Sequence, residues 1–353
     1  MYKKFKNRII RNFSNLPGWR TNRQIVVIES DDWGSIRMSS LDSFNNLKQN
    51  NIPVHENHYT KNDSLECNKD MEYLMELLTK YKDSNNRNIV MTGANIVANP
   101  NFDSIRKNNF KNYIYEPFVE TCKKYPDHDR VYDLWKTAAK ERIFVPTFHG
   151  REHLNVQRWM RALNSGCKST ILAFENEVTG IVKGIDGDNL PNYQAAFDID
   201  EPDDIKYQKE VIISGLDLFE KLYGFRSRFF IPPNGPFNNQ LELIVKKSGV
   251  EYLGTSKIHS EPLGNNKNKK HFRYIGKESH DGLIYMTRNA FFEPGSLKSI
   301  DWVDSCLRDI DIAFKWKKPA TISSHRVNYV GWLNEKNRAN GLKKLDELLF
   351  QII

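Results

Sequence analysis

Two polar clusters each follow directly after an apolar run, and their residue types could together hold a metal ion. Asp31 and Asp32 follow the run QIVVIE, and His149 and His153 follow the run RIFVPTF. Short runs that are apolar on both faces are typical of buried parallel strands. Because the carboxyl ends of parallel strands share one face of a barrel, both clusters should meet at one mouth. Two imidazoles and one carboxylate would leave coordination positions of a catalytic metal open to water.

A third apolar run, ATISS, ends in His325 and would bring another imidazole to the same mouth. An imidazole titrates near neutral pH and can therefore carry a proton in a reaction. Taken singly, these signals are more often structural, since Asp-Asp before Trp-Gly is common in turns and H-x3-H is common on surfaces. Their coincidence at several strand ends favours a catalytic site.

Five segments in this order resemble the motifs of the polysaccharide deacetylases, the family 4 carbohydrate esterases. The matching segments are Ser30-Asp31-Asp32, His149 with His153, Phe230-Ile231-Pro232-Pro233-Asn234-Gly235, Asp301-Trp302 and Ile322-Ser323-Ser324-His325. The first two match closely, and the resemblance spans Ile25 to His325. It implies an α/β fold, a distorted (β/α) barrel with insertions.

The resemblance also implies a role for each matched residue. Asp32, His149 and His153 would hold a divalent metal, Asp31 would be the base and His325 the acid. Zinc is the expected ion, and the same donor set suits cobalt, nickel or manganese. The implied reaction removes an N-acetyl or related acyl group from an amino sugar in a cell-surface polysaccharide or its precursor, so an N-acetylated sugar or glycan is the expected partner.

The chain departs from the family pattern beside the predicted base. Ile231 stands where the family has an arginine that orients the base, so Arg228 or Arg226 would have to replace it. Asn234 replaces an aromatic residue, and Ser323 and Ser324 bring polar groups to the expected acyl pocket. We expect five residues to bind substrate or support the site: Arg228, Asn234, Asp301, Trp302 and Ser324.

Two other functions remain open at this stage. The segment from His149 to His153 also fits H-x-x-E-H, a zinc-peptidase signature in which Glu152 would be the base. That signature requires both histidines on one helix, and Gly150 directly after a strand disfavours a helix there. The other alternative is a barrel that binds glycans without catalysis, which the absence of the family arginine and the polar Ser323 and Ser324 favour.

The elements that position these residues follow from alternating strand and helix patterns. The predicted strands are Gln24–Glu29, Asn88–Thr92, Arg142–Phe148, Arg228–Ile231, Val250–Gly254, Leu283–Thr287 and Ala320–Ser323. Amphipathic helices are predicted around Ile212–Tyr223, Ile300–Phe314 and Leu342–Ile352. Two polar stretches, 45–66 and 166–204, are interpreted as insertions in a single domain that spans 24–353. The polar segment Glu261–Lys270 is predicted to be a solvated loop.

The positive charge of the chain is concentrated at its N-terminus. Residues 1–23 hold seven Lys or Arg and no acid, which leaves 45 basic residues against 44 acidic ones elsewhere, so the net charge of +8 belongs largely to a basic tail. An anionic membrane surface is a plausible peripheral partner for this tail, whereas nucleic acid is disfavoured because no basic stripe with aromatics follows. The start of the chain does not resemble a secretory signal, and the expected location is cytoplasmic.

Overall fold

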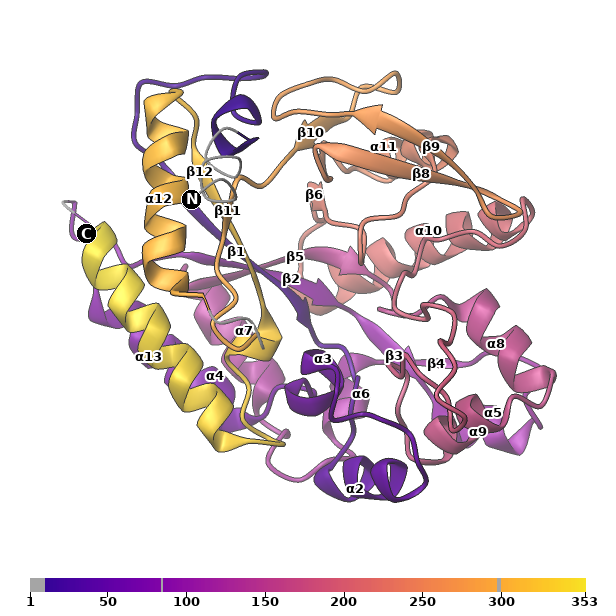
Figure 1. Cartoon of the computed structure of the whole chain (residues 1–353). Coiled ribbons are helices and arrows are strands. Elements are labelled where there is room, and N and C mark those ends of the chain that lie inside the picture. The colour runs from indigo at the N-terminus through magenta and orange to yellow at the C-terminus, as the bar shows by residue number, and fades with distance from the viewer. Residues whose placement is uncertain (1–9, 84, 297–299) are drawn as a thin grey trace.

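The computed structural model describes residues 10–83, 85–296 and 300–353, and its centre is an eight-stranded sheet (Figure 1). The sheet order is β10-β7-β6-β5-β2-β1-β12-β11, and every paired neighbour is parallel. Its strands are β1 Val26–Trp33, β2 Met91–Ile96, β5 Phe144–Gly150, β6 Phe229–Phe230, β7 Tyr252–Gly254, β10 Ile284–Met286, β11 Ala290–Phe291 and β12 Ala320–His325. The seven predicted strands are all present within a few residues, and the α/β class is confirmed.

The sheet is curled into an incomplete barrel. Its two edge strands, β10 and β11, do not pair with each other, yet only Thr287, Arg288 and Asn289 separate them in the chain. A connection of this length spans at most about 14 Å. The two edges of the sheet must therefore lie close together, and the gap between them is crossed by a short segment that contains Arg288.

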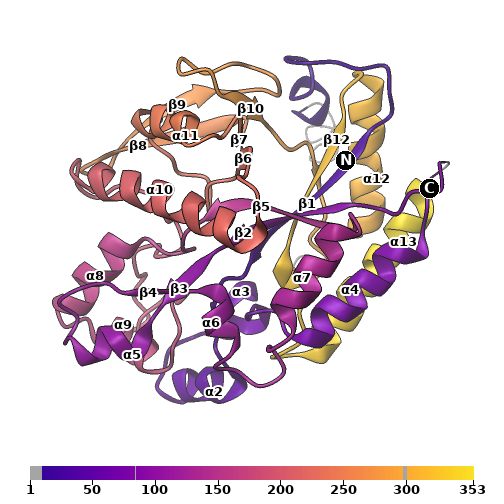
Figure 2. The same cartoon turned by 180° about the vertical axis from the view of Figure 1, so that it is seen from behind.

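Amphipathic helices cover the outside of the curled sheet. They include α4 Asn68–Lys80, α7 Val131–Lys140, α10 Asp204–Tyr223, α12 Trp302–Lys315 and α13 Glu335–Ile352. Helices α7 and α10 pack on β5, α12 packs on β11 and β12, and α13 lies against α4 and α12 (Figure 2). The three predicted helical stripes correspond to α10, α12 and α13. Asp301 caps the start of α12 by accepting a hydrogen bond from the Asp304 amide, and α10 ends at Gly224 with φ of 78°.

Aromatic residues form much of the core between the sheet and these helices. Trp33 packs edge to face on Phe144, with ring centroids 4.8 Å apart, and both rings contact Trp135 on α7. All three side chains are fully buried. Trp33, the residue after the two aspartates, is therefore a core side chain that anchors the end of β1.

Smaller elements complete the fold. They are α2 Leu41–Gln49, α3 His58–Asn62, β3 Ala98–Pro100, α5 Phe102–Lys107, β4 Tyr115–Pro117, α6 Phe118–Cys122, α8 Val156–Asn164, α9 Lys168–Glu175, η1 Asn239–Leu241, α11 Glu242–Lys247 and η2 Arg326–Asn328. The predicted insertions contain α3 and α9. Among the helices the structure describes, none is both long and apolar enough to cross a membrane.

The prediction of a solvated loop at Glu261–Lys270 is wrong. This segment belongs to an antiparallel hairpin of β8 Ile258–Gly264 and β9 Lys267–Phe272. Asn265 and Asn266 connect the strands with φ of 53° and 58°, the left-handed conformation of a type I′ turn, which Asn adopts readily. The lysines that suggested a loop are exposed side chains of β9.

The described part of the predicted basic tail packs on the fold. The amide of Trp19 donates to the carbonyl of Ile275, and the amide of Thr21 donates to the carbonyl of Lys317. The buried Lys318 ammonium donates to the carbonyl of Trp19 at 2.8 Å. Residues 10–23 are therefore attached to the barrel, and residues 1–9 lie outside the described part.

Candidate active site

The two aspartates reach the mouth through an irregularity at the end of β1. Asp32 has a φ of 78°, and the pairing of β1 with β2 shifts register between Ser30 and Trp33. In a regular strand, consecutive side chains point to opposite faces. A bulge re-aims one of them, and here both Asp31 and Asp32 line a single pocket.

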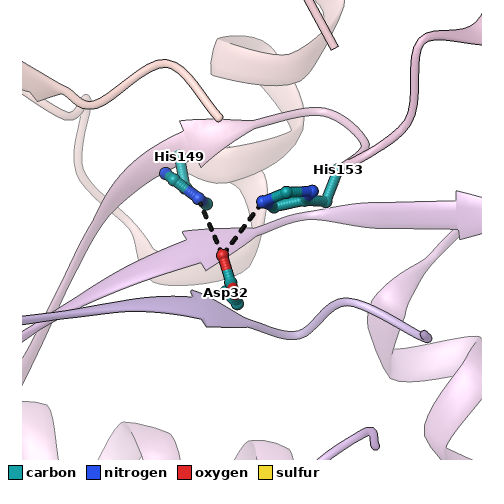
Figure 3. Close-up of side chains that lie close together, drawn as sticks. All are labelled: Asp32, His149 and His153. Carbon is teal, nitrogen blue, oxygen red and sulfur yellow. Dashed lines mark hydrogen bonds and ion pairs between the residues drawn. The ribbon is translucent and has the colours of Figure 1, made fainter. Parts of the chain in front are cut away.

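Asp32, His149 and His153 converge as the two strand ends predicted (Figure 3). The Nε2 atoms of His149 and His153 lie 3.3 and 2.9 Å from the same atom, Oδ1 of Asp32. One candidate ligand atom from each residue lies within 4.8 Å of the others, and all three side chains are buried. His149 comes from β5, and His153 from the loop between β5 and α8.

The protonation of these groups fits a cation between them. Nδ1 of His149 lies 2.7 Å from the carbonyl oxygen of Ile231, which can only accept, so Nδ1 carries the proton. In the neutral ring, the lone pair of Nε2 then faces the carboxylate oxygen of Asp32. Burial lowers the pKa of His153 and outweighs the opposing effect of Asp32, which keeps that ring neutral. Two imidazole lone pairs and one carboxylate oxygen are the donor set of a divalent transition metal.

Arg37 contacts the remaining oxygen of the metal-facing carboxylate. Its Nη2 lies 3.3 Å from Oδ2 of Asp32, and its guanidinium lies over the ring of Tyr59. Burial raises the pKa of Asp32, but His153, His149 and Arg37 outweigh burial and hold the pKa well below its ordinary value. Asp32 is therefore ionised, with Oδ1 directed toward the histidines. No sequence pattern pointed to Arg37, which does not directly follow a predicted strand.

Arg288 holds the second aspartate. Its Nη1 and Nη2 each donate to one oxygen of Asp31 at 2.6 Å, and its Nε donates to Glu29 at 2.6 Å. Burial raises the pKa of Asp31, but Arg288, with help from His149 and His325, reverses this and brings the pKa below its ordinary value. Asp31 is therefore an ionised carboxylate in a fixed orientation.

The expectation that Arg228 or Arg226 orients Asp31 is wrong. Arg228 is an exposed side chain paired with Glu251, and Arg226 pairs with Asp217 on the outer surface. Arg288 is the arginine in contact with Asp31. It directly follows the predicted strand Leu283–Thr287, so the strand-end rule that found the aspartates could have found it.

His325 is paired with a carboxylate that the sequence did not indicate. Its Nδ1 lies 2.5 Å from Oε1 of Glu293, and its Nε2 lies 4.0 Å from Oδ2 of Asp31. Burial lowers the pKa of His325, but Glu293 and the two aspartates outweigh it and raise the pKa to about 10. Glu293 is fixed in turn by the side-chain amide of Asn328 at 2.8 Å. His325 is therefore a protonated imidazolium beside Asp31.

The other expected supporting residues divide into those at the pocket and those away from it. Asn234 lines the pocket. Ser324 does not, because its hydroxyl is engaged with the Phe292 carbonyl and the Tyr329 hydroxyl, and the preceding Ser323 faces the pocket instead. Asp301 and Trp302 also lie outside the pocket lining, at the start of α12, where Asp301 is a helix cap.

The peptidase signature is not realised. His149 ends a strand, His153 lies in a loop, and α8 begins only at Val156, so the two histidines do not share a helix. Glu152 is buried and accepts a hydrogen bond from Nε of Arg151 at 2.6 Å. It belongs neither to the ligand cluster nor to the pocket lining, and it therefore cannot act as the base.

A pocket of about 540 Å³ opens above these groups. This volume is in the usual range for small-molecule sites. Asp31, Asp32, His149 and His325 lie on its polar wall, and the apolar residues that line it include Ile231, Met286 and Phe291.

Comparison of the sequence with protein-family models found no match, and none of the curated proteins matches it. Among solved structures, the chain is similar to a Mycobacterium smegmatis protein classed as a polysaccharide deacetylase, with 9% identity, a TM-score of 0.41 and coverage of 95% of this chain and 86% of that one. It is also similar to the PuuE allantoinase, with 10% identity, a TM-score of 0.43 and coverage of 95% of this chain and 86% of that one. A family 4 carbohydrate esterase pseudoenzyme from Bacillus anthracis is similar as well, with 11% identity, a TM-score of 0.38 and coverage of 96% of this chain and 64% of that one. Likenesses this distant carry no residue roles, so the function rests on the site itself.

Proposed function

We propose that this protein is a metal-dependent amide hydrolase that removes an N-acetyl or related acyl group from an amino sugar of a cell-surface polysaccharide or its precursor. The observation that carries the reaction type is the set of three groups around one pocket: the Asp32–His149–His153 cluster, an ionised Asp31 and a protonated His325. The amino sugar as substrate rests on the order of the five sequence motifs. The non-catalytic alternative relied on the missing arginine and on the polar Ser323 and Ser324, and the contact between Arg288 and Asp31 removes the first of these reasons.

Asp32, His149 and His153 would hold the metal. A divalent ion in such a site lowers the pKa of a water molecule and polarises the carbonyl of the scissile amide. Arg37 keeps Asp32 ionised and directs Oδ1 toward the histidines, while the Ile231 carbonyl fixes the ring of His149 in the tautomer that a ligand needs. Two imidazoles and one carboxylate suit several divalent transition metals, and zinc is our first choice among them.

Asp31 and His325 would move the protons of the reaction. Asp31 is ionised and oriented by Arg288, so it can accept the proton of the attacking water. His325 carries a proton that Glu293 stabilises, so it can donate this proton to the nitrogen of the leaving amine. Each positioned acid or base of this kind contributes roughly 10²–10⁴-fold to the rate. The 4.0 Å between His325 and Asp31 places base and acid on the same side of the pocket.

The test separates ligands from proton carriers with six variants, each measured for metal content and for acetate released from neutral, nucleotide-linked and oligomeric N-acetylhexosamines. Asp32→Ala, His149→Ala and His153→Ala should lose both metal and activity. Asp31→Asn and His325→Ala should retain metal and lose roughly 10²–10⁴-fold in turnover. Glu152→Gln should keep both.

Two results would contradict the proposal. Full metal content in Asp32→Ala would show that the cluster is not the metal site. Wild-type protein that holds metal stoichiometrically but releases no acetate from any of these sugars would instead favour a binding protein.

A further inference from the structure

The charged side chains that line the pocket are almost all paired. Asp31 and Glu29 contact Arg288, and Asp32 contacts Arg37. The lining also contains an ion pair from the N-terminal segment, because Nη1 of Arg11 lies 3.0 Å from Oδ1 of Asp309. Charges with such partners are already neutralised and have little capacity left to recognise a charged ligand.

Lys257 is the exception. It lines the pocket in the segment between β7 and β8, and no carboxylate within the described ranges lies at ion-pair distance from its ammonium. Its ammonium instead donates to the hydroxyl of Ser14, at 3.1 Å. Burial lowers the pKa of Lys257 to about 8, and Asp309 only partly opposes this. Lys257 is half-buried, and an ammonium partly removed from water without a counterion is destabilised unless a ligand supplies one.

Lys257 lies in a different part of the pocket from the proposed catalytic groups. The Lys257 ammonium lies 3.1 Å from the Ser14 hydroxyl, whereas Asp31 is held by Arg288 at 2.6 Å and lies 4.0 Å from His325. The N-terminal segment forms this part of the wall, with Ile10, Arg11 and Ser14 in the lining. Figure 1 shows this indigo segment beside α12, which carries Asp309.

We propose that Lys257 and Ser14 form a subsite for an anionic group of the substrate, a phosphate or a carboxylate remote from the scissile amide. The inference rests on the proposed function for the amino-sugar framework, but the subsite itself follows from the pocket. A charged oxygen would accept from the Lys257 ammonium, which now donates to the Ser14 hydroxyl at 3.1 Å. It would also accept from that hydroxyl once the hydroxyl turns away from the carbonyl of Arg11, to which it now donates at 3.0 Å. The apolar Phe291, exposed over about half of its surface, lies in the same lining and offers a face for a sugar ring.

Binding, measured by calorimetry on the full chain, tests the subsite without turnover. The probes are N-acetylglucosamine, which is neutral, N-acetylglucosamine 1-phosphate and N-acetylmuramic acid, which carries a carboxylate. At least one anionic probe should bind more tightly than the neutral sugar. Lys257→Gln should weaken the anionic probe roughly ten- to hundredfold, the range of one charge-assisted hydrogen bond, and leave the neutral sugar unchanged. Phosphate and carboxylate are distinguished by which probe loses affinity.

Two further variants keep the result interpretable. Lys269→Gln removes an exposed lysine of β9 that does not line the pocket, and it should change nothing. Asp309→Asn removes the negative charge that faces Lys257 and should tighten anion binding, a gain that misfolding cannot produce. Equal affinity for all three probes, or an unchanged anion affinity in Lys257→Gln, overturns the subsite. The proposed function fails separately, if anions bind through Lys257 but no acetate is released.

Discussion

Arg288 should control the protonation of Asp31, and replacing it tests this directly. Arg288 donates to both oxygens of Asp31 and to Glu29, with side-chain exposures of 18% for the arginine and 7% and 6% for the two carboxylates. In Arg288→Met, burial remains as the cause that raises the pKa of Asp31, while the main opposing cause is gone. The pKa of Asp31 should therefore rise above its ordinary value instead of lying below it.

The sign of the pH effect follows from the role of the base. Activity requires ionised Asp31, so a higher pKa moves the acid limb of the kcat/KM profile to higher pH. At neutral pH, loss of an oriented base should lower kcat/KM by roughly 10²-fold or more, and part of this loss should be regained as the pH is raised. Arg288→Lys keeps the charge but not the two-pronged contact, so its profile should lie between those of the wild type and Arg288→Met.

The free energy of unfolding provides a second test of the contact between Arg288 and Asp31, independent of activity. Removing one partner of a buried ion pair typically costs about 3–5 kcal/mol, because it leaves a buried charge uncompensated. In Arg288→Met the folded pKa values of Asp31 and Glu29 exceed their unfolded values, so the loss should be smallest in acid, where both protonate, and grow as the pH rises. Urea unfolding at several pH values measures this. The matched control Arg228→Met removes an exposed arginine paired with Glu251, a surface pair that contributes little to stability.

Two results would contradict this role of Arg288: an Arg288→Met variant that keeps the wild-type acid limb, or one that is destabilised no more than Arg228→Met. Lost activity with an unshifted acid limb would mean that Arg288 shapes the pocket without setting the charge of Asp31.

Three further predictions concern the imidazole, the metal and the N-terminus. Glu293→Gln removes the largest cause that raises the pKa of His325 to about 10, so the alkaline limb of kcat/KM should move to lower pH; an unmoved limb would exclude His325 as the acid. Chelation should abolish activity and lower the melting temperature, because an ion that binds only the folded state stabilises it. Adding metal back should restore both. The triple variant lacking Asp32, His149 and His153 should show no change in melting temperature with chelator or metal. Residues 1–9 contain four Lys or Arg, and each contributes roughly 1 kcal/mol near an anionic membrane. Deleting these residues should therefore abolish salt-sensitive sedimentation with anionic vesicles. Equal sedimentation of the full-length and the truncated protein would exclude membrane binding through this segment.

The three proposed metal ligands, and their place at the mouth of the barrel, could be predicted from the sequence alone. Asp32, His149 and His153 each follow a short apolar run, and a parallel sheet brings the carboxyl ends of such runs to one face whatever the order of the strands. The same rule located Asp31 and His325. The strand ends were enough to predict that these residues share one mouth. The irregularity at the end of β1 and the loop after β5 then bring both aspartates and His153 into their final positions.

Which residues orient these side chains could be seen only in the folded protein. Arg288 lies 257 residues from Asp31 in the chain, and it reaches that carboxylate because the curled sheet brings its two edges together at the segment between β10 and β11. Glu293 meets His325 because β11 pairs with β12. Strand order and curvature arise from the packing of the whole sheet and determine which strand ends meet. The sequence could therefore mark Arg288 as a residue at a strand end, but it could not pair Arg288 with Asp31. The sequence therefore identified the groups proposed to act in the reaction, while long-range packing supplied the charges that set their protonation.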